Sequence, residues 1–332
     1  MKNIVITFIS LVWSIGSLFA QKVVNVSHVA FTVSDTEGTV AFLKNTVEAK
    51  LIDSKSISGN NLQNLYGIKD DNLSLKVTRM HIGNEEVRLL EFESSKQGRV
   101  IPHTSKSNDL WFQHIAIVVN NMDKAYNKVA DLKVEHVSTS PQTLPDYIPA
   151  AAGISAFYFR DKDDHNVELI YFPEGKGNPK WQGKSDTFLG IDHTAIGVSD
   201  TDEGLKFYKD VLGLKVAGNS RNYGTEQEHL NQVFGASLLI TGLHAEKGFG
   251  VEFLQYIAPP DGQLYPSDSS PLDHWHWQTA MEVENLDELY KNIQNSNYKT
   301  VSSGIQSLPE LGYSKAVIVR DYDGHAILLY EK

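Results

Sequence analysis

The chain contains no cysteine. That absence excludes disulfide bonds, thiol nucleophiles, thiolate metal sites and lipid attachment through an N-terminal cysteine. Basic residues are also few, since 30 Lys and Arg stand against 41 Asp and Glu and give a formal net charge of −11. An acidic chain without a basic patch is a poor binder of nucleic acid. A glycine-rich phosphate loop and the context of a nucleophilic serine are missing as well.

Only one stretch approaches the length and apolarity of a membrane segment, and it lies at the N-terminus. Lys2 precedes an apolar run from Ile4 to Trp13, and Ser17-Leu18-Phe19-Ala20 follows before Gln21. This pattern predicts a signal peptide over residues 1–20, because the run is too short and wrongly flanked for a membrane span. A permanent N-terminal anchor is the alternative. We therefore expect an exported protein, periplasmic or secreted, without membrane contact after cleavage, and with a mature charge of about −12.

A strand–helix pattern recurs four times along the remaining chain. His28, His114, His193 and Gln278 each lie in an apolar, strand-like run, at separations of 86, 79 and 85 residues. Nine residues after each of them an acidic residue opens a helical segment, namely Glu37, Asp123, Asp202 and Asp287. With 332 residues and 41% hydrophobic content, the chain can bury a large core and make two domains.

The ends of the repeats match too. Closing strands recur at Val87–Leu90, Val167–Ile170, Val251–Leu254 and Ile327–Tyr330, and the turns Arg160–His165 and Arg320–His325 are nearly identical. The sequence thus predicts an α+β fold of four tandem βαβββ modules arranged as two pairs. A segment rich in Gly, Pro and Lys, residues 173–183, is the expected linker between domains at residues 21–172 and 184–332.

Several of these strands carry an ionisable group inside an apolar run. His114 lies within the strand Trp111–Val119, and Glu168 lies within the closing strand after Phe157–Asp161. An unpaired charge in an apolar sheet costs several kcal/mol or more, so each needs a partner, and a metal ion is one such partner.

Four tandem modules with His or Gln in the first strand and Glu in some last strands resemble the vicinal oxygen chelate (VOC) superfamily. This superfamily includes glyoxalases, extradiol dioxygenases, fosfomycin-modifying enzymes and bleomycin-binding proteins. The resemblance covers Val24 to Lys332. It implies two VOC-type domains, each a curved mixed sheet of two modules, with a divalent metal held on the concave face by the first and last strands of both modules.

The superfamily positions in the first predicted pair are His28, Arg88, His114 and Glu168. The resemblance thus implies a metal site of His28, His114 and Glu168. Two histidines and a carboxylate favour Fe²⁺, while Zn²⁺, Mn²⁺ and Ni²⁺ are alternatives. Arg88 cannot ligate, because a guanidinium only donates hydrogen bonds. We expect it to grip an anionic substrate oxygen, the alternative being a salt bridge, for instance to Glu168.

The second predicted pair offers His193, Glu252, Gln278 and Leu328. The first three form a possible second metal site, but Leu328 removes the fourth ligand, so a structural domain is the alternative. Tyr158 is a candidate general acid or hydrogen-bond donor, with aromatic packing as the alternative. Phe157-Tyr158, Asp161 and Glu168 match part of the extradiol dioxygenase signature, although its upstream histidine is replaced within Pro149–Gly153. His165 and His325 lie in turns and are expected to be structural.

These features predict an exported, metal-dependent enzyme, a dioxygenase, lyase or isomerase. Its substrate would be a small molecule, anionic or with vicinal oxygens that chelate the metal. Two alternatives stay open. One is a non-catalytic protein that sequesters a small molecule, as bleomycin-binding proteins do, and the other is a glyoxalase-like isomerase. The sequence does not define the oligomeric state.

Overall fold

A computed structural model describes residues 22–332, and the predicted signal peptide lies outside them. The first two modules follow one another along the chain. Module 1 comprises β1 (Val23–Thr32), α1 (Thr36–Val47), β2 (Lys50–Ser58), α2 (Asn60–Tyr66), β3 (Ser74–Ile82) and β4 (Glu85–Glu93). Module 2 comprises β5 (Gln113–Val119), α3 (Met122–Asp131), β6 (Glu135–His136), β7 (Gln142–Thr143), β8 (Ser155–Arg160) and β9 (Asn166–Tyr171).

A 3₁₀ turn, η1 (Pro179–Trp181), lies between the two halves of the chain. Module 3 comprises β10 (Phe188–Gly197), α4 (Thr201–Leu205), the π-helical turn η2 (Lys206–Val211), β11 (Lys215–Tyr223), α5 (Thr225–Asn231), β12 (Ser237–His244), β13 (Lys247–Gly248) and β14 (Gly250–Ala258). Module 4 comprises β15 (Trp277–Val283), α6 (Leu286–Gln294), β16 (Gln306–Leu308), the 3₁₀ turn η3 (Pro309–Leu311), β17 (Tyr313–Arg320) and β18 (Ala326–Glu331). The four predicted modules are confirmed.

In every module an Asp or Asn side chain starts the helix that follows the first strand. Asp35, Asn121, Asp200 and Asn285 each accept a hydrogen bond from a backbone N–H of the first helical turn. This satisfies a donor that the helix itself leaves free. The acidic residues that marked the repeat lie in the same first turns, where the helix dipole favours a carboxylate.

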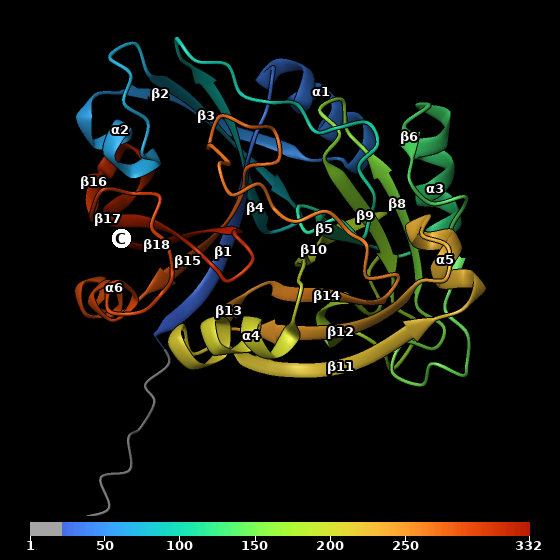
Figure 1. Ribbon diagram of the computed structural model, residues 1–332. Helices are drawn as coiled ribbons and strands as arrows, with labels where there is room; N and C mark the ends of the chain where they lie inside the picture. Colours follow the sequence, from blue (N-terminus) through green and yellow to red (C-terminus); the bar gives the residue numbers. More distant parts are fainter. Residues whose placement is uncertain (1–21) are drawn as a thin grey trace, which may run out of the picture.

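The modules pair differently from the prediction. One sheet has the strand order β16-β17-β18-β15-β1-β4-β3-β2, so it combines module 4 with module 1, and the two-residue β13 of module 3 also pairs with β1. The other has the order β11-β12-β14-β10-β5-β9-β8-β6 and combines module 3 with module 2. We call them the 1–4 sheet and the 2–3 sheet. Figure 1 shows blue and red segments together in one half of the molecule and green and yellow segments in the other. The halves 21–172 and 184–332 therefore share both sheets.

Antiparallel contacts between first strands join the modules at the centre of each sheet. β1 pairs with β15, and β5 pairs with β10. Each first strand also lies parallel to the last strand of its own module, for example β5 to β9. The first strands of modules have similar apolar runs, so the sequence pattern did not reveal which two would pair.

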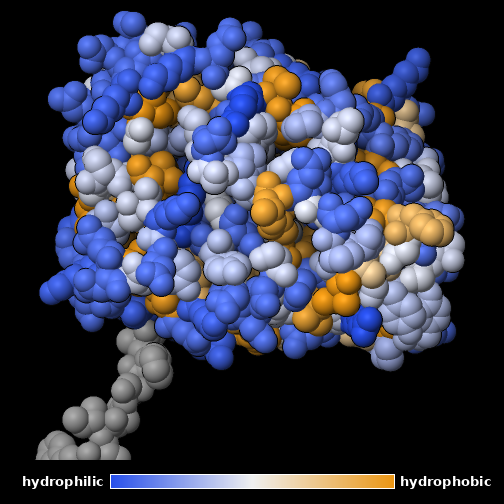
Figure 2. All heavy atoms as spheres, viewed as in Figure 1, coloured by the Kyte–Doolittle hydropathy of each residue, from blue (hydrophilic) through white to orange (hydrophobic). Residues whose placement is uncertain are grey.

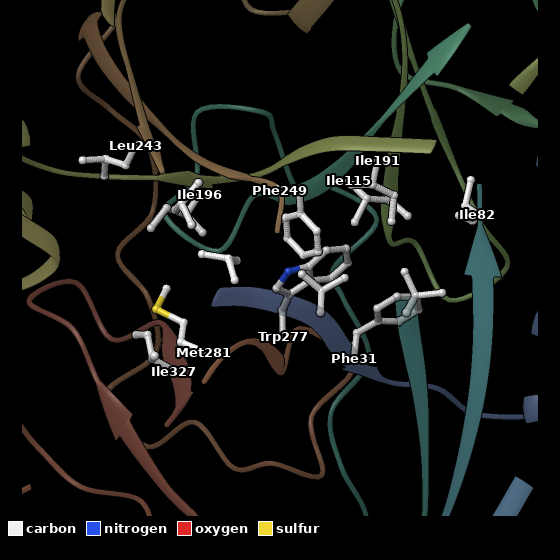
Figure 3. Close-up of a cluster of buried hydrophobic side chains, with 14 of the residues drawn as sticks. Phe31, Ile82, Ile115, Ile191, Ile196, Leu243, Phe249, Trp277, Met281 and Ile327 are labelled. Atoms are coloured by element: carbon white, nitrogen blue, oxygen red, sulfur yellow. The ribbon is translucent and has the colours of Figure 1, made fainter. Parts of the chain in front are cut away.

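The largest apolar core lies between the two sheets and draws on all four modules (Figure 3). It includes Phe31 of β1, Ile115 of β5, Ile196 of β10 and Trp277 of β15, all of them buried. The opposite faces of the sheets carry separate clusters, one on the 1–4 sheet around Tyr66 and one on the 2–3 sheet around Leu230. Any site on these opposite faces thus belongs to a single sheet.

The two matching turns connect the sheets. His165 of the 2–3 sheet contacts the backbone oxygen of His274 at 2.8 Å, and His325 of the 1–4 sheet contacts the backbone oxygen of Leu110 at 2.8 Å. On the face shown in Figure 2, hydrophilic residues dominate and hydrophobic residues form small separate groups. Among residues 22–332, no helix is both long and apolar enough to cross a membrane.

Candidate metal centre

Strand alternation places the candidate ligands on the face of the 2–3 sheet that points away from the shared core. In β5, Ile115 and Ile117 enter that core, so His114 and Ala116 occupy the opposite face. The same alternation in β9 and β14 separates Glu168 and Glu252 from neighbouring apolar residues that pack in the core.

Two buried alanines leave room for four functional side chains. Ala116 is paired with Glu168 on one side and with His193 on the other. Ala195 is paired with His114 on one side and with Glu252 on the other. Because an alanine side chain is a single methyl group, the larger side chains from both flanking strands can converge above it.

The ligand atoms of three buried residues face one another. The Nε2 atom of His114 lies 3.1 Å from Oε2 of Glu168, and Nε2 of His193 lies 3.5 Å from the same oxygen. Each of the three residues offers a ligand atom within 4.8 Å of the other two. None of these three atoms makes a hydrogen bond of acceptable geometry within the described residues, although all are buried. Buried polar atoms normally have partners, so this cluster is suited to a cation.

A fourth group, Glu252, lies beside this cluster. Its Oε2 atom is 3.5 Å from Nε2 of His193. The pKa of Glu252 is raised to about 7, mainly by burial and also by the neighbouring Glu168 and Asp192 carboxylates, while His193 opposes the rise. Burial also raises the pKa of Glu168, but the adjacent imidazoles of His114 and His193 outweigh it and bring that pKa down to about 2. The site is rich in carboxylates and attractive to a cation.

The two imidazoles respond differently to this environment. Burial lowers the pKa of His114 below its usual value, although the Glu168 carboxylate opposes this. Burial acts in the same direction on His193, but the carboxylates of Glu252, Asp192 and Glu168 raise its pKa well above the usual value. His193 is therefore the imidazole more strongly coupled to the surrounding acids.

The cluster opens into a cavity of about 320 Å³. Glu168, His193 and Glu252 line it together with Tyr158, whose ring centroid is 5.0 Å from that of His114. Burial raises the pKa of Tyr158 well above its usual value, and the Glu168 and Glu252 carboxylates add to the effect, so the phenol keeps its proton. The lining is otherwise apolar or neutral, apart from Asp192, and it includes no Lys or Arg side chain among the described residues.

Comparison with known protein families identifies the superfamily of the chain. The family model described as the glyoxalase/bleomycin resistance protein/dioxygenase superfamily matches residues 25–169 and 190–329. The chain belongs to this superfamily. No curated protein sequence matches the chain.

Two solved structures of superfamily type share the fold. Glyoxalase I from Zea mays is 14% identical, with a TM-score of 0.60 and coverage of 92% of both chains. A candidate dioxygenase from Bacillus subtilis subsp. subtilis is 13% identical, with a TM-score of 0.56 and coverage of 94% of this chain and 86% of that one. At these identities the likeness concerns the fold alone.

The 1–4 sheet presents the same superfamily positions with different chemistry. His28 and Gln278 flank the alanine pair Ala30 and Ala280, and Arg88 and Leu328 take the places of the two glutamates. Apolar residues and Tyr66 fill this face. The side-chain oxygen of Gln278 lies 3.2 Å from Nε2 of His276. None of the four superfamily ligand positions in the 1–4 sheet therefore carries a carboxylate.

Two assignments of the first predicted site are corrected by this arrangement. His28 does not join His114 and Glu168, because it lies in the 1–4 sheet and its Nε2 atom is 3.0 Å from the Tyr313 hydroxyl. Arg88 is not beside the candidate metal either. Its Nε donates to Glu86 at 2.6 Å, and Nη1 donates to the Tyr313 hydroxyl at 2.7 Å. The salt-bridge alternative for Arg88 holds, with Glu86 as the partner and not Glu168.

The structure thus regroups the predicted residues. His114, Glu168 and Tyr158 come together with His193 and Glu252. Gln278, predicted to join His193 and Glu252 in a second metal site, lies instead in the 1–4 sheet with His28 and Arg88, so that second site does not form. Two histidines and two glutamates meet in one site, and the chain has no other group of His, Cys, Asp and Glu among residues 22–332 that is arranged to hold a metal. The sequence did contain a relevant signal: every first strand has an alanine two residues after its His or Gln.

Proposed function

We propose that this protein is a divalent-metal-dependent enzyme that acts on a small molecule through two neighbouring substrate oxygens. The observation that carries the proposal is the convergence of His114 Nε2, Glu168 Oε2 and His193 Nε2, buried and without hydrogen bonds. An unsatisfied buried polar group costs about 1–3 kcal/mol. Three such atoms facing one another would therefore destabilise the fold on their own, but they form a suitable ligand set for a metal ion. A divalent ion held there would act as a Lewis acid on the substrate oxygens.

Two further polar groups of the cavity, Glu252 and Tyr158, can transfer a proton or donate a hydrogen bond to the substrate. Glu252 lies outside the three-residue ligand group but lines the same cavity, so it can take a proton from a substrate carbon and return it to a neighbouring atom. Tyr158 keeps its proton and can donate a hydrogen bond to substrate, as expected from its position before Glu168. A proton-transferring isomerase, of glyoxalase type, or a lyase uses both residues.

A dioxygenase is the second candidate. Two histidines and one carboxylate with open positions are the ligand set of non-haem Fe(II) oxygenases, and His114, His193 and Glu168 match it. Glu252 then has no required part in the ligand set. The proton-transfer reaction is favoured because it gives a role to Glu252, the second glutamate of the cavity.

The cavity favours a substrate that is uncharged apart from its chelating oxygens. An anionic substrate was expected from Arg88, which lies in the other sheet. With no Lys or Arg side chain among the described residues of its lining, the cavity offers no ammonium or guanidinium to offset the desolvation of a free carboxylate or phosphonate. Its apolar wall, including Ile154, Ile170 and Ile240, suits an apolar body attached to the chelating group.

Export is also part of the proposal and rests on the N-terminal sequence pattern. N-terminal sequencing of the protein from the exported fraction should begin at Gln21. Finding the full-length chain in the membrane fraction would support the permanent anchor instead.

Metal content tests the central proposal. Wild-type protein purified without chelator should contain about one divalent ion per chain by elemental analysis, and His114→Ala with Glu168→Ala should abolish it. His28→Ala with Arg88→Ala is the matched control, because it alters the corresponding positions of the 1–4 sheet and should leave the content unchanged. Undiminished metal in the first variant would refute the site.

Glu252→Gln separates an enzyme from a binding protein. It should retain the metal and, on a substrate found by screening, lose roughly 100-fold or more in kcat, as expected for a general base. A screen in which the wild type binds ligands but converts none of them would favour the sequestering alternative.

A further inference from the structure

Of the two candidate imidazole ligands, only His193 has a hydrogen-bond partner among the described residues at Nδ1, the ring nitrogen that faces away from the candidate metal site. The Nδ1 atom of His193 lies 3.1 Å from Oδ2 of Asp192. The Nδ1 atom of His114, by contrast, is buried without a partner among residues 22–332. Since a carboxylate accepts and Nδ1 donates, this contact turns the Nε2 lone pair of His193 toward Glu168 and Glu252.

Asp192 is in turn fixed by the segment between the two halves of the chain. Its Oδ1 atom accepts a hydrogen bond of 2.6 Å from the indole Nε1 of Trp181. Trp181 ends η1 and is buried, although most residues around it in the predicted linker are exposed. An indole N–H donates only, so the direction of this bond is unambiguous.

Trp181 has its own anchors. The ammonium of Lys180 lies 4.0 Å from the Trp181 ring centroid and 3.0 Å from Oε1 of Glu85, in module 1. The other oxygen of Glu85 accepts from the backbone N–H of Ile191 at 3.1 Å. Gly190 makes this approach possible, because a Cβ there would lie 2.1 Å from the Glu85 carboxylate and 3.0 Å from Trp181. The segment is therefore packed against β10 immediately before His193.

We propose that Asp192, held by Trp181, is a positioning residue for His193, and that the segment between the halves is thereby part of the metal centre. The inference rests on the proposed function. Partners behind a metal-ligating histidine fix its tautomer and ring orientation, and their loss typically costs 10- to 100-fold in metal affinity. His114 is fully buried, whereas His193 lines the cavity and has Asp192 to fix its ring orientation.

Zn²⁺ affinity of the full mature chain, measured by competition with a chromophoric chelator, tests the proposal. Asp192→Asn and Trp181→Phe should each weaken Zn²⁺ binding, by roughly tenfold or more for Asp192→Asn and by less for Trp181→Phe. The absorption spectrum of bound Co²⁺ should also change in both variants, because it reports the geometry of the ligand set.

Trp111→Phe is the matched control. Trp111 and Trp181 are each 8% exposed, and Trp111 also donates one side-chain hydrogen bond, to Ser105 at 2.7 Å. The control should lose comparable thermal stability while keeping the wild-type Zn²⁺ affinity and Co²⁺ spectrum.

The outcomes separate the two proposals. If the wild type binds Zn²⁺ and both variants bind it within twofold of wild type, with an unchanged Co²⁺ spectrum, the positioning role is refuted and the metal site stands. If the wild type binds neither ion, the proposed function fails and the positioning role fails with it. Because Trp181→Phe preserves the aromatic packing, circular dichroism should show that it folds.

Discussion

The Nε2 atom of His28 accepts a hydrogen bond from the Tyr313 hydroxyl at 3.0 Å. The direction follows from Arg88, whose guanidinium donates to the same hydroxyl and so leaves its proton for His28. The opposite ring atom, Nδ1, lies 2.9 Å from Ser27 Oγ, which itself donates to the backbone oxygen of Ala280. His28 is thus a neutral, fully bonded link between modules 1 and 4, and burial and the nearby Arg88 lower its pKa.

This chain of hydrogen bonds predicts a purely structural role for His28. His28→Leu should reduce the free energy of unfolding by roughly 1–3 kcal/mol, because it leaves the buried Tyr313 hydroxyl without its acceptor. Tyr313→Phe should cost a similar amount, since it leaves His28 and Arg88 each short of a partner. Denaturant unfolding measures both. A loss of bound metal in folded His28→Leu protein would contradict the structural role.

The sequence predicted the positions of the candidate ligands along the strands but not which modules share a sheet. Repeat spacing located His114, Glu168, His193 and Glu252 at equivalent positions, and the superfamily resemblance assigned these positions to the concave face of a sheet. It did not say which modules share a sheet, because the first strands have similar apolar runs and the pairing of β5 with β10 depends on long-range packing. The grouping with His28 followed from assuming that consecutive modules pair. Asp192 and Trp181 gave no pattern in the sequence.

The turn histidines predict a pH-dependent contribution to stability. In His325, Nδ1 donates to Asp321 at 2.8 Å and Nε2 donates to the Leu110 oxygen at 2.8 Å, so the ring carries both protons. His165 is held in the same way by Asp161 and the His274 oxygen. Burial opposes the charge, but these acceptors outweigh it and raise the pKa of both histidines.

A group whose pKa is higher in the folded state binds more protons there, so its stabilisation is present below the unfolded pKa of about 6.5 and declines as pH rises through the folded value. The stability difference between wild type and His325→Asn should therefore be largest below about pH 6.5 and should shrink above it. Denaturant unfolding across this range measures the difference. His136→Asn, in the exposed edge strand β6, is the control. A pH-independent difference for His325→Asn would show that its charge contributes nothing.

The absence of Lys and Arg side chains from the described cavity lining predicts a preference between two ligands that differ mainly in charge. Metal-loaded protein should bind 3,4-dihydroxybenzamide at least about tenfold more tightly than 3,4-dihydroxybenzoate, because the carboxylate would be desolvated without a partner. Calorimetric titration measures both affinities. Ile240→Arg places a cation in the cavity wall and should move the preference toward the benzoate. Tighter binding of the benzoate by the wild type would contradict the proposed uncharged substrate.

Module pairing makes a prediction about the two halves of the chain. The half 21–172 contains module 1 of one sheet and module 2 of the other, so alone it exposes the central strands β1 and β5, and the other half alone exposes β15 and β10. Proteolysis in the exposed stretch 183–186 should therefore give fragments that elute together in gel filtration and separate only in denaturant.

The same pairing divides the metal ligands between the halves. His114 and Glu168 lie in the first half, and His193 and Glu252 lie in the second. Neither half expressed alone should bind Zn²⁺ with the affinity of the whole chain, whereas halves co-expressed as separate chains should restore it. The whole chain with an uncut linker is the reference. Two independently folded monomeric halves, one of them binding Zn²⁺ like the intact protein, would contradict the pairing of module 2 with module 3.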